Sequence, residues 1–177
     1  MKRLALSLLA LCAAASLRAE EPASFTVGAF TFQRPADWAW VQVNSPMRKA
    51  QLRVTGATAE TSADVTFFHF GPGGGGGVKA NIDRWVGQFR TADGATKIEP
   101  QEIAGAKVTL VSTEGTFSSG MPGGPTTPMD GYALLGAIVE NADGDVFVKL
   151  TGPAALVKES RKKFLDFIGG ALAAAKK

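Results

Sequence analysis

The sequence is poor in the residues that build most thiol and metal centres. Its 177 residues include one cysteine and one histidine. Cys12 lies in an N-terminal segment that we expect to be removed, so the mature chain would have no disulfide, thiol nucleophile or cysteine metal site. A lone histidine, His69, cannot assemble a multi-histidine metal site. The sequence also lacks the Gly-x-Ser-x-Gly motif of a nucleophile elbow. We therefore assign no catalytic residue, metal ligand or cofactor.

The mature chain also lacks a net charge. The whole sequence has a formal charge of +3. Lys2, Arg3 and Arg18 belong to the segment that we expect to be removed, and taking these three from the 19 basic residues leaves 16 against 16 acidic residues. A neutral domain has no general attraction for nucleic acid or for an anionic membrane. We therefore expect no nucleic-acid partner.

Residues 1–19 have the pattern of a secretory signal peptide. Lys2 and Arg3 precede an apolar run over residues 4–15, and the small residue Ala19 stands where a signal peptidase would cut. The apolar run is shorter than the roughly 20 residues that a membrane-spanning helix needs. An uncleaved anchor is therefore less favoured, and we expect an exported bacterial protein, periplasmic or secreted.

The rest of the chain, residues 20–177, is long enough for one domain with its own core. Leu11, a large residue, precedes Cys12, whereas a lipidated cysteine follows a small residue, so lipidation is also less favoured. After signal cleavage we expect a single domain without stable insertion into a membrane.

Residues 65–90 combine a predicted strand, a glycine loop and a predicted helix. The strand, residues 65–70, has apolar residues on both of its faces, which is typical of a sheet covered on both sides. The loop, residues 71–77, consists of six glycines and one proline. In residues 78–90 the apolar residues recur at helical spacing and form one stripe: Val78, Ile82, Trp85, Val86 and Phe89.

The remaining elements alternate between strands and turns. We expect a first strand or hairpin edge over residues 25–32, and further strands over residues 51–54, 97–103, 106–112, 132–140 and 145–150. Glu114 to Phe117 would prolong the strand at 106–112. Residues 118–131 are rich in glycine and proline and predict a loop. Trp38 and Trp40 are expected to cover the core rather than to form a ligand cage.

A second helix is predicted to begin at Pro153, since proline is favoured at the first helical position. Its apolar stripe contains Val157, Phe164, Ile168 and Leu172. Strands joined by short turns predict a largely antiparallel sheet, and two amphipathic helices predict that helices pack on it. The fold class is therefore α+β, a sandwich of helices and sheet.

This arrangement resembles the Mog1/PsbP-like α/β/α sandwich, and most of all the uncharacterised secreted bacterial proteins of that fold. Short matches across the mature chain carry the resemblance: residues 73–77, 81, 84–85, 88–89, 131–132, 135–137, 149–153 and 164. The resemblance implies a non-enzymatic accessory protein. One kind of protein in that superfamily assists photosystem II and another binds a small GTPase, and no functional residue of either kind matches this sequence.

The glycine loop is the first candidate contact surface. Gly73, Gly74, Gly75 and Gly76 could turn backbone N–H groups toward a ligand, and the start of the following helix favours an anion or a peptide carboxylate. The loop formally satisfies Gly-x-Gly-x-x-Gly, but an antiparallel sheet lacks the parallel unit that a dinucleotide site requires. A purely structural connector is the competing interpretation.

Met121 and Met129 bound a proline-rich part of the predicted loop 118–131, and methionine is adaptable at binding surfaces. If the sheet brings this loop and the glycine loop to the same end, the two would form one docking site. A hairpin loop without a role is the competing interpretation.

Together these features predict an exported, non-enzymatic accessory or binding protein whose partner is a cell-envelope protein. Two further functions stay open. One is a carrier of a small ligand or lipid, which needs an apolar pocket. The second is a hydrolase that uses His69 beside the glycine loop.

Overall fold

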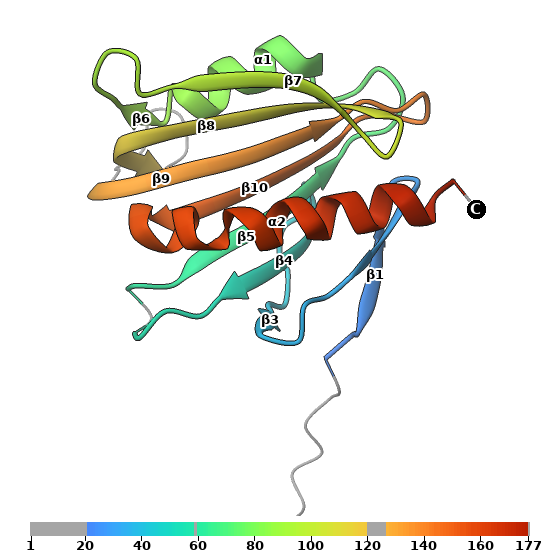
Figure 1. Cartoon of the computed structure of the whole chain (residues 1–177), viewed down its shortest axis with the longest axis horizontal. Helices are drawn as coiled ribbons and strands as arrows, with labels where there is room; N and C mark the ends of the chain where they lie inside the picture. The colour runs from blue at the N-terminus through green and yellow to red at the C-terminus, as the bar shows by residue number, and fades with distance from the viewer. Residues whose placement is uncertain (1–20, 59, 120–126, 177) are drawn as a thin grey trace, which may run out of the picture.

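The computed structural model describes residues 21–58, 60–119 and 127–176. They form three layers, in which an antiparallel sheet of eight strands lies between two helices (Figure 1). The strand order in this sheet is β3-β4-β5-β10-β9-β8-β6, and β7 pairs with β8. This confirms the predicted α+β fold with a largely antiparallel sheet.

The strands of the large sheet are β3 (Trp38–Trp40), β4 (Arg48–Val54), β5 (Ala63–His69), β6 (Phe89–Arg90), β7 (Lys97–Ile103), β8 (Ala106–Ser119), β9 (Thr127–Val139) and β10 (Val146–Pro153). A separate hairpin contains β1 (Ser24–Val27) and β2 (Phe30–Gln33). The helices are α1 (Gly77–Val86) and α2 (Ala154–Ala174). No helix in these described ranges is long and apolar enough to cross a membrane.

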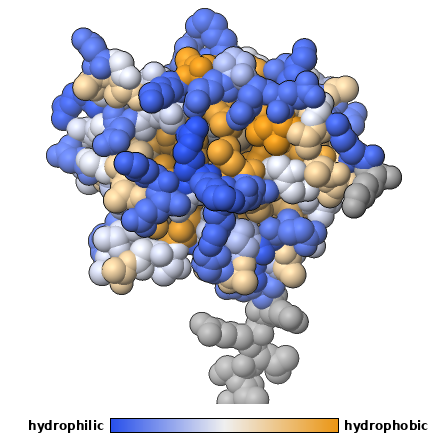
Figure 2. Space-filling model, in the orientation of Figure 1, coloured by the Kyte–Doolittle hydropathy of each residue, from blue (hydrophilic) through white to orange (hydrophobic). Residues whose placement is uncertain are grey.

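The helix α2 and the β1-β2 hairpin cover one face of the sheet. Phe164 and Ile168 of α2 are fully buried there, and Val157 and Leu172 are nearly so, as the predicted stripe requires. Trp38 lies inside this core rather than over it, with 1% of its surface exposed. From the side of α2, Figure 2 shows hydrophilic side chains mixed with apolar ones.

The start of α2 differs from the prediction by one residue. Pro153 is the last residue of β10, where it pairs with Tyr132, and it caps the helix with an extended backbone instead of occupying the first helical position. The helix continues through the glycine pair at 169–170 to Ala174. The buried stripe therefore outweighs the low helix propensity of glycine.

The predicted helix over residues 78–90 was too long. Helix α1 ends at Val86, and the N–H of Gly87 closes its last turn by donating to the carbonyl of Asp83. Phe89 and Arg90 form the short strand β6, which pairs with β8. Phe89 is buried by its place in the sheet, so its helical spacing from Trp85 was misleading.

The predicted loop over residues 118–131 was also wrong at both ends. Strand β8 extends through Ser119, and β9 begins at Thr127. The register of these strands shifts between Gly115 and Phe117. That irregularity breaks the alternation of apolar and polar residues on which a strand prediction depends.

Candidate functional site

The face of the sheet opposite α2 is only partly covered by helix α1. Trp85 of α1 lies directly on Gly136 of β9, where an added Cβ would collide with the indole ring. Trp85 packs there with Val111, Leu134 and Ile138. The helix therefore rests over β8 and β9, and it leaves part of the neighbouring strands β10, β5 and β4 uncovered.

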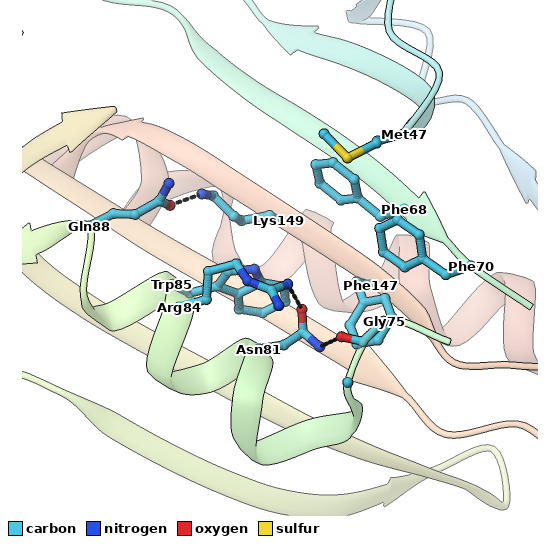
Figure 3. Close-up of a pocket in the computed structure, with 11 residues that line it drawn as sticks. Met47, Phe68, Phe70, Gly75, Asn81, Arg84, Trp85, Gln88, Phe147 and Lys149 are labelled. Carbon is cyan, nitrogen blue, oxygen red and sulfur yellow. Dashed lines mark hydrogen bonds between the residues drawn. The ribbon is translucent and has the colours of Figure 1, made fainter. Parts of the chain in front are cut away.

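A groove, which we call the α1 groove, lies between the helix and these strands. Its volume is about 480 Å³. Its apolar lining comes from five side chains: Met47, Phe68, Phe70, Trp85 and Phe147. Met47 and Phe70 are 61% and 41% exposed, so the rim of the groove is itself apolar. Figure 3 shows these side chains around the space between α1 and the strands.

The glycine loop forms part of the groove wall through Gly75 and Gly76. A Cβ on Gly75, whose φ is +79°, would come within 2.9 Å of the rings of both Phe70 and Phe147. Gly73 and Gly74 do not line the groove. Close contact with aromatic side chains is the physical reason for glycine at position 75.

The buried side chain of Asn81 fastens this loop to α1. Its amide nitrogen donates to the carbonyl oxygens of Gly75 and Gly77, at 2.7 and 2.8 Å. Only 2% of Asn81 is exposed. Asn81 thus holds the loop in place as part of the groove wall.

Two cationic side chains, Arg84 and Lys149, line the groove, and a third, Arg48, lines a smaller cavity that adjoins it. Each of the three donates to a neutral amide oxygen (Figure 3 draws two of these bonds). Arg48 donates to Gln51 at 2.6 Å, Arg84 to Asn81 at 2.9 Å and Lys149 to Gln88 at 2.5 Å. None of these cations takes part in the six ion pairs found among the described residues.

Lys149 is the most deeply placed of the three. Burial, and secondly the charge of Arg48, lower its pKa from the ordinary 10.5 to about 8. Its ammonium nitrogen lies 5.5 Å from the centre of the Phe117 ring. A register shift between Arg48 and Ala50 in β4 pairs Arg48 with Phe68, and so brings the guanidinium to this face.

A smaller cavity of about 260 Å³ adjoins the groove and shares Phe68, Gln88 and Lys149 with it. Asp64 lines this cavity, and both of its oxygens accept hydrogen bonds from Arg53, at 3.0 and 3.5 Å. The Thr151 hydroxyl oxygen also lies there, and it is the one buried side-chain polar atom in the described ranges without a hydrogen-bond partner.

His69 does not line the groove. Its ring packs against Gly28 and Val146, and Nδ1 lies 3.3 Å from the Asp145 carbonyl oxygen. Val146 belongs to the core on the α2 side. The sheet thus separates His69 from the aromatic wall beside the glycine loop. No group of three potential metal-ligating side chains occurs among the described residues.

The glycine loop and Met129 lie at opposite ends of the sheet. His69, which precedes the loop, pairs with Val146, and Val146 pairs with Val139 at the end of β9. Met129 lies near the start of β9, opposite Phe117. A single docking site made of both is therefore wrong for Met129, and Met121 lies outside the described residues.

Sequence reasoning missed the three cations and the aromatic wall. One signal was present at Lys149, since a lysine within the apolar strand Val-Phe-Val-Lys-Leu is unusual for a buried sheet. The placement of Arg48 depends on a strand irregularity, which a pattern of alternating residues does not reveal.

No protein-family model matches this sequence, and no curated protein matches it. Among solved structures, the solution structure of cyanobacterial PsbP (CyanoP) from Synechocystis sp. PCC 6803 is similar, with 12% identity and a TM-score of 0.51. The match covers 88% of this chain and 95% of that one. A Pseudomonas aeruginosa crystal structure, described as a protein of unknown function PA94 and putative regulator, matches at 10% identity and a TM-score of 0.47, over 82% and 92% of the two chains. The chain has a PsbP-like fold.

Proposed function

We propose that this protein is an exported binding protein without catalysis of its own, and that it takes a small ligand with an apolar body into the α1 groove. The observation that carries the proposal is the groove itself. Its volume of about 480 Å³ lies within the range of about 300–1,000 Å³ typical of small-molecule sites. Its mixture of aromatic side chains and a few polar groups is also typical of such sites.

The apolar rim supports binding over a purely structural role. Met47 and Phe70 are two of the three large apolar side chains that are exposed among the described residues, and both line this groove. Covering them with a ligand removes apolar surface from water, which is favourable. The presence of two exposed apolar side chains at one groove favours a carrier of a small ligand over a hydrolase that uses His69.

The proposed place of action follows from the expected signal peptide at residues 1–19. An exported carrier would meet the source or the recipient of its ligand in the cell envelope. We therefore propose a cell-envelope protein as its partner, in keeping with the accessory role that the resemblance implies.

The test is a nuclear magnetic resonance titration of the mature chain with decan-1-ol, a neutral apolar ligand. The three tryptophan indole N–H signals serve as reporters. We expect the Trp85 signal to shift, because Trp85 lines the groove, and the Trp38 signal to stay, because Trp38 is buried on the α2 side. Equal shifts of both signals, or no shift, would contradict the proposal.

A matched pair of variants locates the binding further. Met47→Glu places a charge at the rim of the groove and should weaken decan-1-ol binding by about tenfold, the size expected when about 1.4 kcal/mol is lost. Ile98→Glu is the control, since Ile98 is 51% exposed on β7 and does not line the groove. Equal affinities of the two variants would count against the groove.

A further inference from the structure

We infer that the α1 groove selects an anionic amphiphile, a molecule with an apolar body and one carboxylate or phosphate head group. The head group would bind Lys149 and Arg48, and the body would lie on the aromatic wall. This inference rests on the proposed function and adds the chemical class of the ligand.

The first argument is the charge that the site leaves unbalanced. Lys149, Arg48 and Arg84 all have neutral amide oxygens as partners. Lys149 is largely removed from solvent, whereas Arg48 and Arg84 are exposed. A buried cation such as Lys149 is costly unless an anion compensates it. Amide oxygens satisfy single N–H groups but leave the positive charges in place, so the groove is matched to a ligand that brings a negative charge.

The second argument is that the one carboxylate among the residues lining the groove and the adjoining cavity does not supply this charge. Asp64 lines the cavity next to Lys149, but its two oxygens are both held by Arg53. The pKa of Lys149 is lowered by burial and by a second cation, and an anion bound beside it would oppose both effects.

The third argument is the position of the charges relative to the apolar wall. Lys149 and Phe147 lie two residues apart on β10, so their side chains emerge on the same face of the sheet. Arg48 is paired with Phe68, which is itself paired with Phe147. The cations and the aromatic rings thus lie on one face of three neighbouring strands, and one amphiphile can reach both.

The test compares ligands of equal chain length by isothermal titration calorimetry. We expect decanoate to bind at least tenfold more tightly than decan-1-ol, since a hydrogen bond to a charged group contributes about 1.5–3 kcal/mol. Acetate, which has the head group without the body, should not bind measurably. Decyl phosphate is titrated in parallel, and tighter binding than decanoate would assign the head group to a phosphate ester.

Two variants connect the preference to the proposed cations. Lys149→Met and Arg48→Met should each lower the affinity for decanoate by tenfold or more and change the affinity for decan-1-ol by less than about twofold. Arg48 is exposed, so its replacement leaves the fold intact. Lys79→Met is the matched control, because Lys79 is exposed on α1 and pairs with Asp83.

The outcomes separate this inference from the proposed function. If decanoate and decan-1-ol bind equally well, or if the two variants retain the wild-type affinity for decanoate, the inference is overturned and the proposed function stands. If neither ligand binds while the Trp85 signal stays unchanged, both fail.

Discussion

The two faces of the sheet differ in how completely they are covered and in the side chains that they bury. On the α2 face, a helix of 21 residues and the β1-β2 hairpin bury a large apolar cluster, in which Phe164 and Ile168 have no exposed surface. On the α1 face, a helix of ten residues covers part of the sheet and leaves a groove and an adjoining cavity, which together have three cations beside aromatic rings. One face is organised for stability, and the other retains polar and charged groups that a stable core would not contain.

The largest expected effect tests this difference with two phenylalanines on opposite faces. Phe164→Ala should lower the free energy of unfolding by about 3–5 kcal/mol, as large truncations in closed cores do. Phe68→Ala, in the half-buried groove wall, should cost less than about 2 kcal/mol, because solvent fills the space it leaves. Urea denaturation of both variants measures the two costs. Similar costs would show that the α1 face is as closely packed as the α2 face.

The second-largest loss of stability is expected at the contact between Trp85 and Gly136. Gly136→Ala should cost about 1–3 kcal/mol, the range for overpacking, because its methyl group collides with the indole ring and lifts α1 from the sheet. Thermal denaturation measures the cost. In a Trp85→Ala background the same change should cost much less. An equal cost in both backgrounds would mean that Trp85 does not press on this glycine.

Lys149 is expected to destabilise the domain at neutral pH. Its folded-state pKa of about 8 lies below the ordinary 10.5 of the unfolded chain. Below pH 8 both states carry the charge, and the folded state bears the full cost of burying it. Between about pH 8 and 10.5 the folded state releases the proton first, so this contribution to the free energy of unfolding rises with pH.

Lys149→Met should therefore stabilise the protein at pH 7, by roughly 1–3 kcal/mol after allowance for partial exposure. The gain should shrink toward pH 10. Arg48, Arg84 and the Arg53–Asp64 pair also face this region, and all remain in the variant, so the difference between the two pH profiles isolates Lys149. A destabilised variant at pH 7 would contradict the cost assigned to this lysine.

The smallest loss of stability is expected when the glycine loop is released from α1. Asn81→Ala removes two hydrogen bonds to the carbonyls of Gly75 and Gly77 and should cost about 1–2 kcal/mol. Amide hydrogen exchange should accelerate in residues 74–77 and stay unchanged in α2. Unchanged exchange in the loop would show that Asn81 does not hold it.

The sequence predicted the layers because their signals are local. The stripe from Val157 to Leu172 has clear helical periodicity, and the apolar run at residues 65–70 is typical of a covered strand; both elements formed within one or two residues of the predicted bounds. The end of α1 was missed because Phe89 continues the helical spacing although Gly87 ends the helix. Strands β8 and β9 were predicted, but their ends bordering residues 120–126 were missed because the register shifts between Gly115 and Phe117.

The candidate site was harder to predict from the sequence, because it depends on strand order and register. Met129 and Gly75 were candidates for one shared site, but the antiparallel pairing places them at opposite ends of the sheet. Lys149 and Arg48 lie about 100 positions apart in the chain, and pairing through β5 brings them to the same face. Such proximity has no signature in a single sequence.

The most direct test of the central claim is a crystal structure of the mature protein with decanoate. We predict that the alkyl chain lies in the α1 groove between Trp85 and Phe68, and that the carboxylate lies within hydrogen-bond distance of Lys149 Nζ. An empty groove at saturating decanoate, or a ligand bound elsewhere on the molecule, would contradict the account.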